Sequence, residues 1–283
     1  MDSTSSNLHE VMTSNLKQIF HHKGKSFVRE VLLADANVPY KLSVDRSKNK
    51  LFFCINADDF SNQSFHLVVL DLETGIPWVI QGIRNGFASA VDPATGTVYL
   101  GGSNGIFKYN YNTLAAQGPV LNRVDVFDMF FKNELYFVDT ATQALSILRN
   151  TRKVPVKALK GYLIQHFIID GKDDFLFTNS TGLYILPHGH QAANLVPYSD
   201  TMNFRGAAVD TYGHAHFITE DGVYQIDKNT NQLRKWLSVR NGYGLAFDKY
   251  NNIIYSDERS INKIYPLECT KDDSDADNSN FGQ

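Results

Sequence analysis

The sequence predicts an all-β fold, a six-bladed β-propeller of four-stranded antiparallel blades, and three observations lead to it. First, one phrase recurs about every forty residues, a period typical of repeat architectures. Its clearest copies are the segments 87–110, 206–227 and 244–265, and weaker copies are 41–56 and 166–187. Second, each copy holds a short apolar strand ending in a polar residue, a turn, and two more apolar strands. Third, the repeated region shows no sustained helical period.

The residue that ends the first strand of each unit, here called the anchor, counts the repeats. The six anchors are Asp45, Asp92, Lys132, Asp170, Asp210 and Asp248. Lys132 departs from the pattern, because the segment 127–139 has a shorter turn and no Asp at this position. The other anchors are interpreted as turn formers whose carboxylates accept backbone N–H bonds. Because one unit cannot bury its own apolar face, six units are expected to close into a ring.

The two ends of the chain are expected to differ from the repeats. Residues 1–26 form a polar extension whose only weakly helical part is 8–20, and residues 27–270 form the propeller. The last unit has three strands, so the segment 27–34 is expected to add the fourth and close the ring. The acidic tail 271–283 lacks apolar periodicity and is expected to be disordered.

Composition excludes several classes of partner. A net charge of −3 gives no basic field, so neither nucleic acid nor a membrane surface is expected as a partner. No apolar run is long enough to span a bilayer, and the first 26 residues lack the hydrophobic stretch of a secretory signal, which leaves a cytoplasmic location open. Cys54 and Cys269 are expected in neighbouring blades, either as one disulfide or as two free thiols. No cofactor is predicted.

The candidate site follows from the register of the repeats. The first strand of each blade lines the channel, so residues five before the anchors should form a ring at one mouth. These residues are Tyr40, Phe87, Phe127, Gln165, Arg205 and Tyr243. Nearby positions in the same loops add Arg84, Asn85, Asn203, Arg240 and Asn241. Aromatic faces stack on conjugated rings, arginine binds carboxylates, and amides bind ring carbonyls. The set predicts a flat, aromatic, acidic ligand. The alternative is that the aromatics fill the core and the Asn-Gly pairs serve turns.

A metal-dependent hydrolase is the rival interpretation, since several six-bladed propeller enzymes hold a divalent ion in the channel. The mouth positions offer Asp125 together with the three asparagines but no glutamate, a donor set that would bind a hard cation weakly. The pairs His188/His190 and His214/His216 are interpreted as structural. No serine nucleophile elbow, phosphate-binding glycine loop or zinc-spaced cysteine set is present. A non-enzymatic role is therefore predicted, with no metal site.

The phrases at 83–111, 173–186 and 241–257 resemble the ommochrome-binding proteins of moths and butterflies. The resemblance spans about residues 31–267 and implies a secreted insect haemolymph protein that binds ommochromes such as xanthommatin, or their tryptophan-derived precursors. These pigments are planar, conjugated and carry carboxylates, which is the ligand class that the ring residues suggest. The polar start of the chain departs from the family, whose members begin with a signal peptide. The alternatives are a lactonase or esterase of the gluconolactonase–regucalcin type and a protein-interaction propeller.

Overall fold

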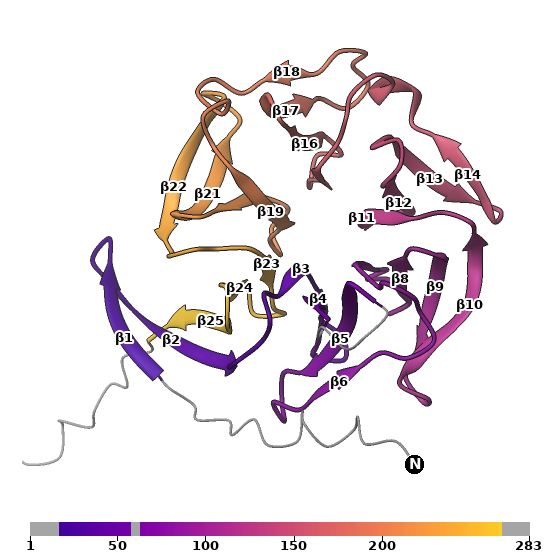
Figure 1. The fold of residues 1–283 in the computed structure, drawn as a ribbon. Coiled ribbons are helices and arrows are strands. Elements are labelled where there is room, and N and C mark those ends of the chain that lie inside the picture. The colour runs from indigo at the N-terminus through magenta and orange to yellow at the C-terminus, as the bar shows by residue number, and fades with distance from the viewer. Residues whose placement is uncertain (1–16, 58–62, 268–283) are drawn as a thin grey trace, which may run out of the picture.

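The six-bladed propeller predicted from the sequence is confirmed. The computed structural model describes residues 17–57 and 63–267. Six antiparallel sheets surround a central channel, and the described residues contain one short 3-10 helix, Lys157–Leu159 (Figure 1). The innermost strands contact one another around the whole ring, so the blades form one closed body.

Five blades are consecutive four-stranded sheets whose first strand lies at the channel. The first two consist of β3 (Tyr40–Asp45), β4 (Lys50–Asn56), β5 (Phe65–Asp71) and β6 (Pro77–Val79), then β7 (Ala88–Val91), β8 (Val98–Gly102), β9 (Gly105–Asn110) and β10 (Ala115–Asn122). The third consists of β11 (Val126–Lys132), β12 (Glu134–Asp139), β13 (Leu145–Arg149) and β14 (Arg152–Pro155). The last two consist of β15 (His166–Ile169), β16 (Phe175–Asn179), β17 (Gly182–Leu186) and β18 (Asn194–Leu195), then β19 (Phe204–Val209), β20 (Ala215–Thr219), β21 (Gly222–Asp227) and β22 (Gln232–Ser238).

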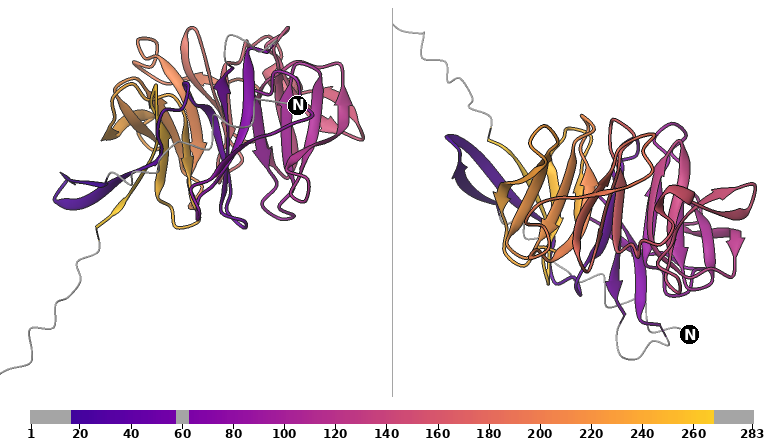
Figure 2. Two further views of the ribbon diagram at one scale, coloured as in Figure 1. Left: turned by 60° about the horizontal axis from the view of Figure 1, so that its bottom comes forward. Right: turned by 90° about the horizontal axis from the view of Figure 1, so that it is seen from above.

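The sixth blade combines strands from both ends of the described chain. Its inner strands are β23 (Leu245–Phe247), β24 (Ile253–Ser256) and β25 (Ile261–Pro266). The strand β2 (Lys25–Leu33) pairs antiparallel with β25, and β1 (Lys17–His22) pairs with β2 as a fifth strand. Figure 2 shows the β1–β2 hairpin projecting from the side of the ring.

The expectation of a loose, weakly helical extension is wrong for Lys17–His22, which forms β1. The outer edge of β2 would otherwise expose unpaired backbone groups, and a short helix is marginal by itself. The ring of Phe20 also stacks on that of Phe27, with centroids 5.7 Å apart. The rest of the extension, the acidic tail and Cys269 lie outside the described residues, so the pairing of Cys54 stays a prediction.

The central strands of each blade are apolar on both faces because each face packs against a neighbouring blade. In β4, Leu51 and Phe53 pack toward the sixth blade, whereas Phe52 and Cys54 pack toward the second. Successive side chains point to opposite faces of a strand, and each blade is enclosed between two others. All four side chains are fully buried. The core therefore lies between blades and leaves the channel to the inner strands.

The anchors close the turn that follows each inner strand, as the sequence predicts. Backbone N–H groups of these turns donate to the carboxylates of Asp45, Asp92, Asp170, Asp210 and Asp248. Lys132 instead reaches the neighbouring blade, where its Nζ donates to the backbone oxygen of Asp170 at 3.0 Å. It also forms an ion pair with Asp173 at 3.3 Å. The third blade thus places a cation where most blades place an acid.

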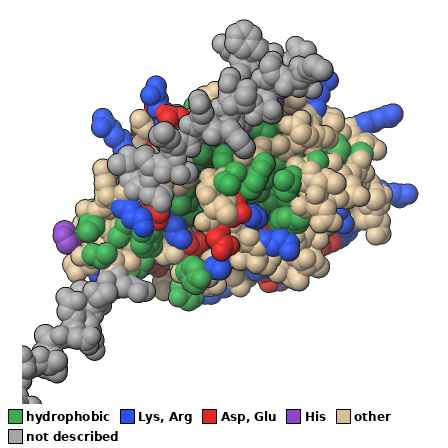
Figure 3. Space-filling model, turned by 90° about the horizontal axis from the view of Figure 1, so that it is seen from below, with side chains coloured by type: hydrophobic (Ala, Val, Ile, Leu, Met, Phe, Trp, Pro, Cys, Tyr) green, Lys and Arg blue, Asp and Glu red, His purple; other side chains and the backbone are tan. Residues whose placement is uncertain are grey.

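Charged side chains of both signs lie on the surface of the propeller. Figure 3 shows basic and acidic side chains interspersed with hydrophobic ones on one side of the molecule, rather than a field of one sign. Within residues 17–57 and 63–267, no helix has the length and apolarity that a membrane crossing needs.

Candidate ligand-binding site

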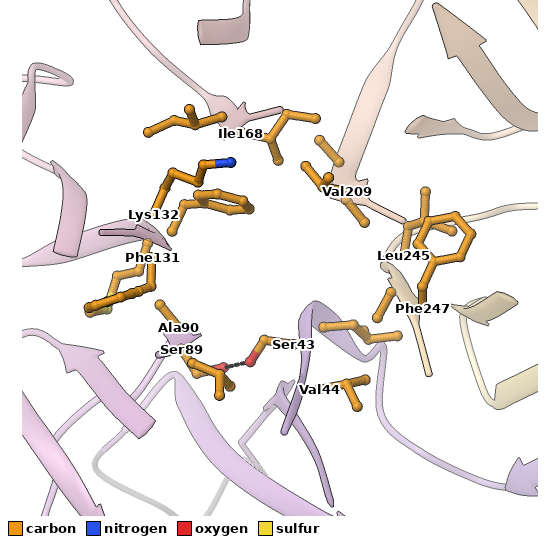
Figure 4. A pocket seen from close by; sticks show the side chains of 18 of the residues that line it. Ser43, Val44, Ser89, Ala90, Phe131, Lys132, Ile168, Val209, Leu245 and Phe247 are labelled. Atoms are coloured by element: carbon orange, nitrogen blue, oxygen red, sulfur yellow. Dashed lines mark hydrogen bonds between the residues drawn. The ribbon is translucent and has the colours of Figure 1, made fainter. Parts of the chain in front are cut away.

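A cavity of about 360 Å³ occupies the central channel, and inner strands of all six blades line it (Figure 4). Its rim includes the exposed turn residues Arg46, Pro93 and Thr211, so the cavity opens at the end where the anchors lie. Its deepest described layer contains Lys41, Asp128 and His166. A volume of this size lies within the range of small-molecule pockets, roughly 300–1,000 Å³.

The walls of the cavity are mostly apolar. Figure 4 shows side chains from several blades around the open centre, among them Val44, Ala90, Ile168, Val209 and Leu245. One polar pair interrupts them, Ser43 and Ser89, whose hydroxyl oxygens lie 2.6 Å apart. Small side chains among the lining residues fill less of the channel than larger ones would: Ala90, Ala207 and Ala246. The walls can therefore desolvate a ring system.

Two cations lie on the rim, and both are bonded to backbone oxygens. The Arg46 guanidinium donates to the carbonyl oxygens of Phe247 and Val209, each at 3.2 Å, and so reaches from the first blade to the sixth and fifth. Lys132 donates to a backbone oxygen of the fourth blade, as described above. A carboxylate is a stronger acceptor for these donors than a neutral carbonyl.

The deep layer is a buried polar cluster. The ammonium of Lys41 lies 2.9 Å from Asp128 Oδ2 and 3.0 Å from His166 Nδ1, and only 9% of the lysine side chain is exposed. Burial raises the pKa of Asp128, while the Lys41 ammonium acts in the opposite direction. Burial and the same ammonium hold the pKa of His166 well below its ordinary value. The cluster therefore contains one ion pair and one neutral imidazole.

Five of the six residues predicted to form a ring do come together, all except Gln165, but at the opposite end of the channel. The rings of Tyr40 and Phe87 lie 6.2 Å apart, those of Tyr40 and Tyr243 5.5 Å apart, and those of Phe87 and Phe127 5.5 Å apart. The Arg205 guanidinium lies 4.5 Å from the centre of the Tyr243 ring. None of these residues, nor Gln165, lines the cavity, which stops short of this layer. Their contact with a ligand stays a prediction.

The flanking residues lie around the same end. Asn85 and Asn241 have φ values of 45° and 51°, the left-handed conformation that turns use. The side-chain oxygen of Asn85 accepts a bond from the Ser64 N–H at 2.6 Å. Arg84, Asn203 and Arg240 are exposed. The two asparagines thus occupy the turn role that the alternative interpretation gave them.

The structure offers no obvious metal centre within the described residues. No group of three or more His, Cys, Asp or Glu side chains there could hold an ion. His214 and His216 both bond to Asp210 Oδ2, at 3.1 and 3.3 Å, and His216 also packs against Trp236 and Phe247. His188 and His190 stand in an exposed turn. These contacts agree with a structural role for His214 and His216.

Sequence reasoning missed the cavity by a single position. Lys41, Asp128 and His166 each stand four residues before an anchor, one step beyond the predicted ring. Because successive residues of a strand face opposite sides, a shift of one changes which side chains meet in the channel. The available signal was the presence of Lys, Asp and His at equivalent positions of otherwise apolar strands, together with the exceptional Lys132.

Comparisons with known proteins agree with this architecture. The chain is 27% identical over 264 residues to the ommochrome-binding protein of Manduca sexta, covering 92% of this chain and 95% of that protein. No family model matches it. Its fold is similar to a gluconolactonase from Xanthomonas campestris, with a TM-score of 0.65 and 12% identity over 89% of this chain and 95% of the other. It is also similar to the calcium-binding protein regucalcin of Agrobacterium tumefaciens, with a TM-score of 0.62 and 12% identity over 83% and 93% of the two chains. At these identities the structural likenesses show the fold alone. The match along nearly the whole sequence supports the resemblance to ommochrome-binding proteins that the repeated phrases predict.

Proposed function

We propose that this protein is a non-enzymatic carrier that binds an ommochrome-type pigment, or a related planar tryptophan metabolite, in the cavity of its central channel. The observation that carries the proposal is the cavity itself, an apolar pocket whose rim holds Arg46 and Lys132. A planar, conjugated ligand with carboxylates matches both features. The name of the Manduca sexta relative supports the same ligand class.

Binding would combine burial of the ring system with charge pairing at the rim. Apolar walls such as Phe131 and Ile168 remove the conjugated rings from water, which contributes about 25 cal/mol per Å² of apolar surface. Carboxylates left at the mouth would replace the backbone acceptors of Arg46 with charged ones and would share the Lys132 ammonium with Asp173. Both changes are reversible, as a carrier requires. The family resemblance supports an extracellular place of action.

A lactonase or esterase is the alternative that the shared propeller fold raises. Asp128 is the carboxylate of the deep layer, and it is paired with Lys41 at 2.9 Å, an arrangement that competes with metal coordination. Isothermal titration with Ca²⁺, Mn²⁺ and Zn²⁺, followed by lactone-hydrolysis assays with and without chelator, tests this function. Stoichiometric metal and chelator-sensitive hydrolysis would replace the carrier proposal.

The direct test is an absorbance spectrum of the protein from its natural source, followed by titration with xanthommatin and kynurenine-pathway compounds. A visible band that copurifies, or saturable micromolar binding with quenched Trp or Tyr fluorescence, is the expected result. A colourless protein that binds none of these compounds would contradict the proposal.

A further inference from the structure

One buried side chain of the cavity holds a hydrogen-bond donor that the protein leaves unused. His166 lies in the deep layer, and its Nδ1 is 3.0 Å from the Lys41 ammonium. An ammonium has donors only, so Nδ1 must act as the acceptor in this contact. The ring is neutral, as argued above, and a neutral imidazole carries one proton. That proton is therefore on Nε2.

The tautomer is fixed by a chain of contacts. Asp128 holds Lys41 at 2.9 Å, and Lys41 in turn occupies Nδ1 of His166. The Lys41 ammonium also lies 4.6 Å from the centre of the Phe127 ring, which limits its movement toward the aromatic end. Across residues 17–57 and 63–267, no hydrogen bond to His166 Nε2 is present. A fixed donor in a cavity wall is a recognition element, since a partner of wrong chemistry leaves it unsatisfied.

We propose that His166 orients the ligand by donating its Nε2–H to a neutral acceptor on the ring system, such as a ring carbonyl. This inference rests on the proposed function and adds the direction in which the ligand enters. The charge of the deep layer explains why the acceptor is neutral. Lys41 is already paired with Asp128, so a ligand carboxylate there would face a buried like charge. Carboxylates therefore stay at the rim beside Arg46 and Lys132, and the carbonyl end goes in first.

Two probes separate this inference from the carrier function. One is a phenoxazinone dicarboxylic acid, and the other is the matched phenoxazine dicarboxylic acid, which lacks the ring carbonyl. We expect the wild-type protein to bind the phenoxazinone at least tenfold more tightly and to shift its visible band to longer wavelength. Equal affinities would overturn the inference alone. Failure of both compounds to bind would overturn the proposed function and this inference with it.

Two substitutions at one position provide the matched control. His166→Phe keeps a planar ring but has no donor, so the tenfold preference and the band shift should disappear. His166→Gln keeps an acceptor for Lys41 and a donor beyond it, so both should be largely retained. A purely structural histidine would predict equal losses for both compounds in both variants, and that result would overturn the inference.

A measurement without ligand covers the case in which a variant does not fold. In the wild-type protein, ¹⁵N–¹H correlation spectra at pH 7 should show His166 as the neutral Nε2–H tautomer. Addition of the phenoxazinone should move the Nε2 resonance, and the phenoxazine should leave it in place. A ring protonated on Nδ1, or a charged ring, would overturn the inference whatever the variants show.

Discussion

The two ends of the propeller channel are built from adjacent residues of the same six strands, yet they differ in what they leave open. At the aromatic end, Tyr40, Phe87, Phe127 and Tyr243 contact one another, and Arg205 lies over one of their rings. At the anchor end, the walls separate and enclose the cavity. Residue types that favour a planar ligand are therefore not by themselves a site, because they favour one another equally well. A binding pocket needs both these residue types and an unfilled volume between them.

The deep layer separates the two ends, and breaking it should have the largest effect. Lys41→Met leaves the Asp128 carboxylate buried without its partner, which should lower the free energy of unfolding by about 3–5 kcal/mol. Urea denaturation measures this loss, and Lys41→Met combined with Asp128→Leu should recover most of it. At the aromatic end the ion pair of Arg205 reaches an exposed Glu220, so Glu220→Gln should cost about 1 kcal/mol or less. Equal losses would show that the deep layer is not buried as described.

Filling one end and then the other should separate the two candidate sites. Val209 faces the cavity, so Val209→Trp should block it and weaken xanthommatin binding about 100-fold, or 2.7 kcal/mol. The matched change Gln165→Trp places the same bulk in the aromatic layer and should leave affinity within about threefold, or 0.65 kcal/mol. Fluorescence titration of both variants, after circular dichroism confirms their folding, decides between the ends. The reverse outcome would place the ligand at the aromatic end.

Removing one cation from each end also tests which end binds the ligand, with a smaller expected change in affinity. Lys132→Met should weaken binding by about 1.5–2 kcal/mol, because a charge-assisted bond to a ligand carboxylate is lost. The sequence-based site instead requires Arg205→Ala to cost about 1.5–3 kcal/mol, whereas the cavity predicts a change below about 0.5 kcal/mol. Isothermal titration at two salt concentrations distinguishes these expectations. An unchanged affinity in Lys132→Met would remove that residue from the site.

Acid should destabilise the protein through two histidines that remain neutral in the folded state. Burial lowers the pKa of His166 beside Lys41 and Asp128, and that of His216 beside Asp210 and His214. Below about pH 6.5 the unfolded chain binds protons that the folded rings do not, so stability falls as the pH falls. Between pH 7 and 5.5, each such histidine contributes a loss of at most about 1.3 kcal/mol, and His166→Gln should remove its share. Urea midpoints across this range measure the slope. An identical slope in that variant would contradict the neutral state of His166.

The repeat itself determined the fold. The forty-residue period, the anchors from Asp45 to Asp248 and the apolar alternation of strands such as β4 are local patterns, and six copies have one compact arrangement. The same register also identified which residues meet at one end, since equivalent positions in a closed ring lie at equivalent depths. The expectation for residues 17–22 was wrong because pairing with β2, a tertiary contact, outweighed a weak local pattern.

Only the tertiary structure decided where the channel is open. The contact of Tyr40 with Tyr243, and that of Lys41 with both Asp128 and His166, join blades far apart in the sequence. Whether such side chains fill the channel or line it depends on the sum of their sizes around the ring, with small residues such as Ala90 and Ala207 as important as large ones. Sequence determines which residues share a layer, because the strand period is local. The free volume in each layer depends on the side chains of all six blades together, so it cannot be read from any single segment of the sequence.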